Sequence, residues 1–166
     1  MIFRTEHWVA TSLENAFRFF SDPQNLPRIS PPESGARLVK RDLAPPPGVP
    51  GNAALAGAGS RLTISARMVP HLPFRGEWIA QITEFEYLRY FADVQLKGPF
   101  KKWRHRHEFE AAQRDGRNGV IIRDVVDYEV GFGFLGSLAD ALFVRRQLEK
   151  MFAYRQRQAE QFLGGT

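Results

Sequence analysis

The sequence contains no cysteine, and this absence excludes disulfide bridges, thiolate catalysis and metal sites built from cysteine. It also has no apolar run long enough to span a bilayer. Its first residues lack the basic stretch and apolar core of a secretory signal peptide, so we expect a cytoplasmic protein. Motifs for a nucleophile elbow or a phosphate-binding glycine loop are missing as well.

The composition is typical of a globular protein with one core. The 166 residues are 43% hydrophobic and 25% charged, so we expect a single domain over residues 1–166. The net charge is +5, but the cations are spread along the chain. The one local cluster before the last helix, Lys101 and Lys102 with Arg104 and Arg106, has no nucleic-acid-binding motif beside it. We therefore expect no nucleic-acid partner.

The start of the chain predicts a strand followed by two short helices. The strand is expected over residues 2–9. Thr11 and Glu14 have the spacing of a capping box at the start of the first helix. Apolar residues then recur every three or four positions, as on the buried face of a helix. Asp22 and Pro23 have the pattern of a second helix start.

The middle of the chain predicts an antiparallel meander. Residues 44–59 are rich in Pro, Gly and Ala, and we expect a long, exposed and mobile connection there. The short strands that follow one another without intervening helices indicate antiparallel pairing. Strands are expected over residues 36–43, 61–68, 74–85 and 86–96, and then around residues 103–109 and 122–128.

The end of the chain predicts one long helix over residues 135–162, entered through a glycine-rich turn. An apolar stripe runs along this helix, and a curved sheet wrapped around it would bury the stripe and leave space between helix and sheet. The cations of the helix are assigned to its basic, solvent-facing side. They are Arg145, Arg146, Lys150, Arg155 and Arg157.

The stretch from Phe91 to Tyr128 carries polar groups on strand faces that otherwise look buried. Side chains alternate across a strand with a period of two. Histidines, carboxylates and an amide therefore share faces with large aromatic residues, which is more typical of a pocket wall than of a dry core. The three faces are Phe91, Asp93 and Gln95; Trp103, His105, His107 and Phe109; and Ile122, Asp124, Val126 and Tyr128.

The turns predict which of these residues face each other. A two-residue type I′ turn at Asp115-Gly116 would put His107 opposite Asp124, and Trp103 opposite Tyr128. A turn at Asn118-Gly119 is an alternative with a different register. In the preceding hairpin, pairing Gln95 with Trp103 would put Asp93 opposite His105. The predicted buried cluster comprises Asp93, Gln95, His105, His107, Asp124 and Tyr128.

The order of the predicted elements resembles the helix-grip fold of the SRPBCC superfamily, which includes START lipid-binding domains, polyketide cyclases and plant pathogenesis-related allergens. The resemblance implies an α+β fold in which a curved antiparallel sheet of six or seven strands wraps around the C-terminal helix. It also implies a polyketide-cyclase-like or ligand-binding protein. The motif that carries it is Phe91-x-Asp93-x-Gln95, Gly98-Pro99-Phe100, Trp103-x-His105-x-His107-x-Phe109, Asp124-x-Val126-x-Tyr128 and Phe152-x-Tyr154-Arg155.

Three functions are compatible with this polar face. The first is binding of a hydrophobic small molecule, such as a lipid, isoprenoid or polyketide, in a cavity between the sheet and the last helix. The second is a cyclase or dehydratase that uses a histidine as general base and Tyr128 as proton donor. The third is lipid transfer during peripheral contact with an anionic membrane. A purely structural hydrogen-bond network is the remaining alternative.

The candidate residues follow from these functions. His105, His107, Asp124 and Tyr128 are the candidate catalytic groups. Two histidines on one strand face with Asp93 could chelate zinc, but further ligands are not apparent, so we expect no metal and no cofactor. The candidate ligand-binding residues are Trp78, Phe91, Asp93, Gln95, Trp103, His105, His107, Phe109, Asp124 and Tyr128.

Overall fold

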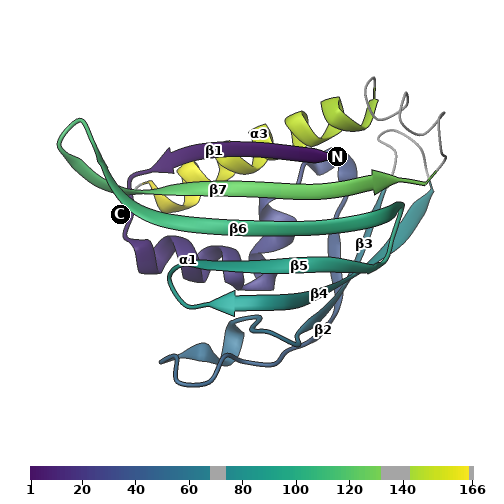
Figure 1. The fold of residues 1–166 in the computed structure, drawn as a ribbon, viewed down its shortest axis with the longest axis horizontal. Coiled ribbons are helices and arrows are strands. Elements are labelled where there is room, and N and C mark those ends of the chain that lie inside the picture. Colours follow the sequence, from purple (N-terminus) through teal and green to yellow (C-terminus); the bar gives the residue numbers. More distant parts are fainter. Residues whose placement is uncertain (68–73, 132–142, 165–166) are drawn as a thin grey trace.

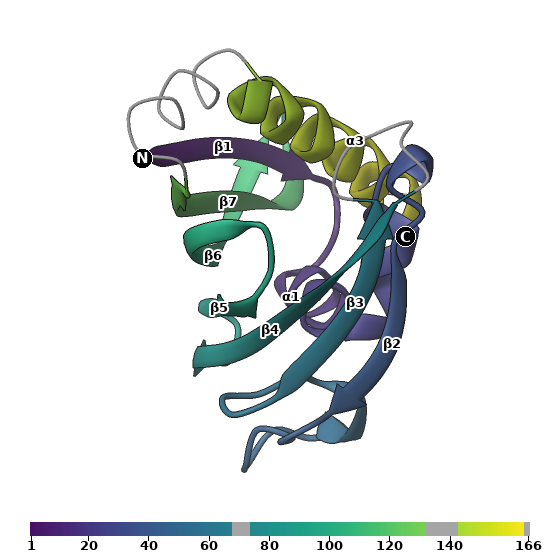
Figure 2. The ribbon, with the colours of Figure 1, turned by 90° about the vertical axis from the view of Figure 1, so that its right-hand side faces the viewer.

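The computed structural model describes residues 1–67, 74–131 and 143–164 of the chain. Within them, a single seven-stranded antiparallel sheet has the order β1-β7-β6-β5-β4-β3-β2 (Figure 1). Each strand pairs with its neighbour in sequence, except that β1 lies against the last strand, β7. The sheet is curved, and α1 and α3 lie on its concave side (Figure 2). This arrangement confirms the α+β fold expected from the sequence.

The bounds of the elements are close to the predicted ones. Among residues 1–67, 74–131 and 143–164, no helix is long and apolar enough to cross a membrane. The strands are β1 (Ile2–Val9), β2 (Arg37–Asp42), β3 (Arg61–Arg67), β4 (Arg75–Glu86), β5 (Tyr90–Lys97), β6 (Phe100–Arg114) and β7 (Arg117–Val130). The helices are α1 (Leu13–Ser21), the 3-10 helices η1 (Pro23–Ile29), η2 (Pro32–Ser34) and η3 (Asn52–Ala54), and α3 (Arg145–Leu163).

The cap of α1 differs from the predicted one. Ser12, not Thr11, is the N-cap, and its hydroxyl accepts a hydrogen bond from the Asn15 amide at 3.1 Å. Thr11 is one residue too early and is buried. Glu14 does not reach back to the cap but accepts a hydrogen bond from Arg18 at 2.8 Å. The prediction that Asp22 caps the next helix is confirmed.

The connection between β2 and β3 is only partly the exposed loop expected from its composition. Leu55 and Ala56 are buried, and the Ala56 amide donates to the Ser21 carbonyl. The buried Ser60 hydroxyl accepts from the Ala44 amide at 2.9 Å. Such backbone bonds give a proline-rich segment a defined path although it lacks regular structure. The expected exposure is therefore found at residues such as Pro47 and Gly48 but not at Leu55 and Ala56.

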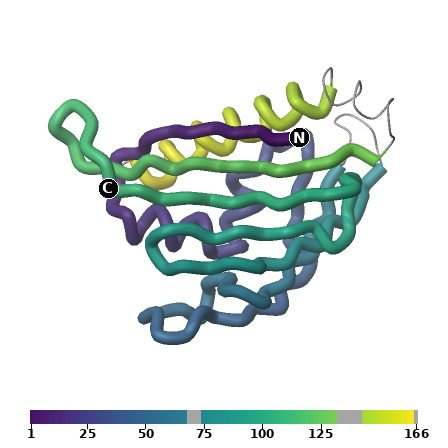
Figure 3. Tube along the Cα trace, viewed as in Figure 1, coloured from purple at the N-terminus to yellow at the C-terminus, as the bar shows by residue number. Residues whose placement is uncertain are grey.

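The register of the last hairpin is the predicted one. Asp115 and Gly116 both have positive φ, 51° and 74°, as a type I′ turn requires, and Arg114 pairs with Arg117. The alternative turn is excluded because Gly119 pairs with Ala112 inside the ladder. The tip of this hairpin projects beyond the neighbouring strands (Figure 3).

The buried side of the sheet contains two separate apolar clusters. One is built around Phe17, Phe91 and Phe109, and the other around Phe3 and Phe152. The second cluster brings α3 onto β1, where the Phe3 and Phe152 rings lie 5.2 Å apart. The residues between the two clusters are polar, and they form the candidate site described below. Residues 135–142 of the predicted long helix lie outside the described residues.

The close packing of the β6–β7 hairpin against β1 can be tested by substituting a glycine. A Cβ at Gly119 would collide with the Trp8 indole and the Val9 carbonyl, whereas one at Gly131 would meet no neighbour. We expect Gly119→Ala to destabilise the protein by about 1–3 kcal/mol, because overpacking forces the backbone to shift. Gly131→Ala is the matched control and should change stability little. Equal urea midpoints for the two variants would contradict this packing.

Candidate functional site

The site is assembled by the registers of three adjacent strands. Asp93 on β5 lies opposite His105 on β6, and His107 on β6 lies opposite Asp124 on β7. All four residues share the inner face of the sheet, because their strand positions alternate with outward-facing ones. The predicted burial is confirmed for His105, His107 and Asp124, of which Asp124 is 1% exposed, whereas Asp93 is half-buried.

Asp124 is the centre of the cluster, because two histidines approach the same carboxylate oxygen. His105 Nε2 lies 2.9 Å from Asp124 Oδ1, and His107 Nδ1 lies 2.7 Å from that oxygen. The His107 contact is short but poorly aligned for a hydrogen bond. An ionised carboxylate can only accept, so a neutral His105 must carry its proton on Nε2.

The interior shifts the titration of these groups in opposite directions. Burial opposes ionisation of Asp124, but the electrostatic effect of His107 and the hydrogen bond from His105 outweigh burial and hold its pKa well below the usual range. Burial, reinforced by His107, lowers the pKa of His105 to about 3 despite the hydrogen bond to Asp124. At neutral pH the cluster therefore contains an ionised Asp124 and a neutral His105.

Asp93 forms the second carboxyl of the site. Its Oδ2 lies 3.7 Å from His105 Nδ1, which is too far for a hydrogen bond. Burial raises the pKa of Asp93 to about 6, although His107, Arg155 and a hydrogen bond from Trp103 each oppose the rise. Asp93 is therefore the carboxyl in this cluster that can change its protonation near neutral pH.

Gln95 does not join the cluster as the sequence predicted. Its amide nitrogen donates to the Phe100 carbonyl at 2.7 Å, and its amide oxygen accepts from the Phe100 amide at 3.3 Å. The side chain therefore closes the turn between β5 and β6. The described pairing of these strands ends at Val94 and Arg104, one residue short of the predicted pair of Gln95 and Trp103.

Aromatic side chains surround the histidines. The rings of His105 and His107 lie 4.0 Å apart, Phe91 lies 4.5 Å from His107, and Phe152 of α3 lies 5.3 Å from His105. Trp78 and Trp103 form an edge contact at 5.0 Å farther along the sheet.

The two remaining candidates extend these walls. Phe109 stacks at 6.4 Å from His107, and Tyr128 lies opposite Trp103, two residues along β7 from the partner of His105. The aromatic residues expected from the sequence therefore flank the polar groups on both sides.

Two polar residues of the site were missed by sequence reasoning. Arg155 of α3 is buried, and the acidic groups whose charge acts on it are Asp124 and Asp93. Assigning it to the solvent-facing side of the helix was wrong. The signal was available, since Arg155 follows Phe152 by three positions and precedes Ala159 by four, which places it in the buried stripe.

His7 is the second missed residue, and it lies on the inner face of β1. Burial lowers the pKa of His7, while Asp124 and Glu160 act in the opposite direction. Neither ring nitrogen has a hydrogen-bond partner among the described residues. Its alternation with the buried Phe3 and Val9 indicated this position.

A divalent cation could contact three of these residues. Asp93, His105 and His107 each offer one ligand atom, and these atoms lie within 4.8 Å of one another. The geometry of the histidines opposes this use, because His105 Nε2 and His107 Nδ1 already point at Asp124. The neighbouring guanidinium of Arg155 also disfavours a cation. The expectation of no metal stays a prediction.

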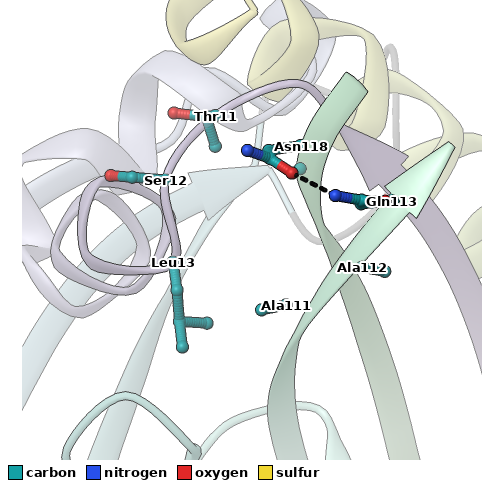
Figure 4. Close-up of a pocket in the computed structure, with 8 residues that line it drawn as sticks. Thr11, Ser12, Leu13, Ala111, Ala112, Gln113 and Asn118 are labelled. Atoms are coloured by element: carbon teal, nitrogen blue, oxygen red, sulfur yellow. Dashed lines mark hydrogen bonds between the residues drawn. The ribbon is translucent and has the colours of Figure 1, made fainter. Parts of the chain in front are cut away.

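A surface pocket of about 270 Å³ lies elsewhere, between the start of α1 and the outer end of the β6–β7 hairpin (Figure 4). None of its lining residues is titratable at neutral pH, and the side-chain amide of Gln113 donates a 2.9 Å hydrogen bond to the side-chain oxygen of Asn118. The pocket therefore has few groups that could react with a ligand or hold its charge. Its lining residues are Thr11, Ser12, Leu13, Ala111, Ala112, Gln113, Asn118 and Gly119.

Comparison with known proteins agrees with this architecture. A family model described as polyketide cyclase / dehydrase and lipid transport matches residues 9–155. The sequence has no significant match among curated proteins. At the level of structure, a START superfamily protein from Mycobacterium smegmatis superposes with a TM-score of 0.67 at 14% identity, covering 98% of this chain and 96% of that one.

Two plant proteins are similar in structure as well. Major latex-like protein 151 from Panax ginseng has a TM-score of 0.66 at 11% identity, with 98% of this chain and 97% of that one covered. Norcoclaurine synthase from Thalictrum flavum has a TM-score of 0.61 at 14% identity, with 95% and 91% covered. At such identities the likeness establishes the helix-grip fold and leaves the activity to the site.

The raised pKa of Asp93 leads us to expect that the stability of the protein depends on pH. Because its pKa is raised from 3.8 to about 6 in the folded protein, the stability contributed by its neutral form is complete below pH 4 and lost as pH rises through 6. We expect Asp93→Asn to gain about 1–2 kcal/mol over wild type between pH 5 and pH 8. Urea unfolding at the two pH values measures this gain.

Asp127→Asn is the matched control for this experiment. Asp127 lies on the outer face of β7, and its hydrogen bond from Lys102 lowers its pKa. It is therefore ionised in both the folded and the unfolded chain from pH 5 to pH 8, and its replacement should add no pH dependence there. A gain for Asp93→Asn no larger than that for Asp127→Asn would contradict the burial of Asp93.

Proposed function

Because the chain belongs to the polyketide cyclase / dehydrase and lipid transport family, we propose that it binds an apolar small molecule between the inner face of its sheet and α3. The observation that carries this proposal is the polar cluster around Asp124, which lies between two apolar clusters. An apolar site with a few convergent polar groups is the usual form of a small-molecule pocket. The aromatic walls would hold the ligand body, and the polar groups would orient it.

Unsatisfied polar atoms favour ligand binding over a purely structural network. Among the described residues, Asp124 Oδ2, Arg155 Nε and both ring nitrogens of His7 are buried without a hydrogen-bond partner. A network that served only to fix strand register would pair these atoms, because each unpaired one costs about 1–3 kcal/mol. A bound molecule or ordered water would complete them.

The direct test is mass spectrometry of the freshly purified protein, sprayed under native conditions and compared with its organic extract. We expect a stoichiometric apolar adduct that is released by the solvent. The chemical class of the adduct would identify the ligand. If the protein is empty and no apolar probe binds it, then the binding role is wrong.

Acid–base catalysis is a second candidate, and the contact of two histidines with one carboxylate favours it. Asp124 would hold His105 in a fixed tautomer, and His105 or His107 would remove a proton from an enolisable ligand. Tyr128, the proton donor in this scheme, lies farther along β7, opposite Trp103. Such chemistry would need no cofactor.

This candidate predicts a separation of binding from turnover. Replacing His105 or His107 by Gln keeps a polar side chain of similar size but removes the titratable ring. We expect turnover of the copurified molecule to fall at least about 100-fold, while the molecule still binds. Retained turnover in both variants would exclude the histidines from the reaction.

Exchange of a lipid at a membrane is a separate prediction. It depends on the exposed cations of α3, which include Arg146, Lys150 and Arg157. Attraction of these cations to anionic lipids would be screened by salt. Sedimentation with phosphatidylserine vesicles at low and high salt distinguishes this role from binding in solution.

A further inference from the structure

Arg155 presents a buried charge that no residue in the described part of the chain pairs. The residue is 9% exposed, and its guanidinium carbon lies 5.1 Å from the centre of the Phe152 ring. Among residues 1–67, 74–131 and 143–164, its guanidinium makes no hydrogen bond and no ion pair, and its Nε is fully buried without a partner. Other arginines of the chain, such as Arg18 and Arg123, hold carboxylates directly.

An unpaired guanidinium in the interior is energetically unfavourable. Burial lowers the pKa of Arg155, but the group stays charged because arginine does not lose its proton in proteins. Its five N–H donors lie in one plane. They can therefore donate to the two oxygens of a carboxylate, or to the two lone pairs of one carbonyl oxygen. A buried group of this kind indicates a partner that arrives from outside the chain.

Neither carboxyl group of the cluster forms an ion pair with Arg155 among the described residues. Asp124 Oδ1 is shared by His105 and His107, and Asp93 Oδ2 lies 3.7 Å from His105 Nδ1. Both acids influence Arg155 electrostatically, yet neither lies within 4 Å of it in the part of the chain that the structure describes. Their charge lowers the cost of burying the guanidinium without using its donors.

His7 offers a second donor near this charge. Its lowered pKa makes the ring neutral at pH 7, so one nitrogen carries a proton and the other does not. Arg155 and Asp124 are both among the groups that perturb it. Strand β1 and helix α3 are held together beside it by a hydrogen bond from Gln156 to Thr5 at 2.7 Å. The donors of Arg155 and His7 therefore lie in the same part of the site, where α3 packs on β1.

We propose that Arg155, assisted by His7, binds a carbonyl or carboxylate oxygen at the polar end of the apolar ligand. This inference rests on the proposed ligand-binding function and narrows it to oxygen-bearing apolar molecules. The aromatic residues near His105 and His107 contact the ligand body, and the guanidinium fixes its direction. A molecule of pure hydrocarbon would leave the donors of Arg155 unpaired.

Three naphthalene probes of similar shape test the proposal. They are 2-acetylnaphthalene, which has a ketone oxygen, 2-naphthoate, which has a carboxylate, and 2-ethylnaphthalene, which has no oxygen. Naphthalene fluorescence gives the dissociation constant of each probe. Hydrogen bonds to a charged donor are worth about tenfold or more in affinity, so we expect at least one oxygen-bearing probe to bind about tenfold tighter than 2-ethylnaphthalene. The better of the two identifies the ligand as ketone or acid.

Arg155→Met keeps an unbranched, flexible side chain and removes the charge and donors. We expect the preference for the oxygen-bearing probe to fall about tenfold, to the level of the hydrocarbon. Arg155→Lys keeps a charge but not the planar set of donors, and should lose part of the preference. If the methionine variant does not fold, the lysine variant still reports the preference. Arg146→Met, on the exposed side of the same helix, is the matched control and should keep the wild-type preference.

The outcomes separate this inference from the function on which it rests. Equal affinities of wild type for all three probes, or an unchanged preference in the Arg155 variants, would overturn the role of Arg155 and leave apolar binding intact. Failure of every probe to bind would overturn the proposed function itself. A preference that falls in the Arg155 variants but not in Arg146→Met would support both.

Discussion

The contact of two histidines with Asp124 is the interaction on which the inner face of this protein depends. It exists because His107 lies directly opposite Asp124 and His105 lies two positions away on the same face. A slip of one residue between β6 and β7 would turn these groups outward and bring charged residues into the core. The type I′ turn at Asp115 and Gly116 prevents that slip, so the geometry of a distant turn determines the chemistry of the site.

The polar cluster around Asp124 also lowers the stability of the fold, since it divides the apolar interior in two. Burying Asp124, Asp93 and Arg155 is unfavourable unless their partners are well placed, and replacing such groups by apolar ones often stabilises a protein. Within the described ranges, several polar atoms of this cluster nevertheless have no partner. A region that lowers stability and leaves hydrogen-bonding capacity unused is more typical of a binding site than of a structural core.

Sequence reasoning predicted the fold and the four central polar residues because the relevant signals were local. Alternation with a period of two identified the faces, and one dipeptide gave the register that joins His107 to Asp124. The errors arose where the determining contacts are distant in sequence. Gln95 is drawn to the Phe100 backbone, and the segment around Leu55 is buried by contact with Ser21.

Arg155 shows a different limit. Its spacing from Phe152 was visible, but the residue type outweighed the spacing, because arginine on a helix is usually exposed. Charge alone did not reveal that this arginine is buried and influenced by two carboxyl groups of the sheet. Where residue type and helical spacing disagree, as they do at Arg155, the disagreement itself indicates a functional position.

We conclude that Asp124 holds a neutral His105 in a buried, fixed orientation. The imidazole ¹⁵N chemical shifts of His105, followed by NMR from pH 4.5 to pH 8, test it most directly. We expect a neutral ring protonated on Nε2 throughout this range, since the pKa of His105 is lowered to about 3. A ring that titrates near pH 6.5 and exchanges between tautomers, as exposed histidines do, would contradict it.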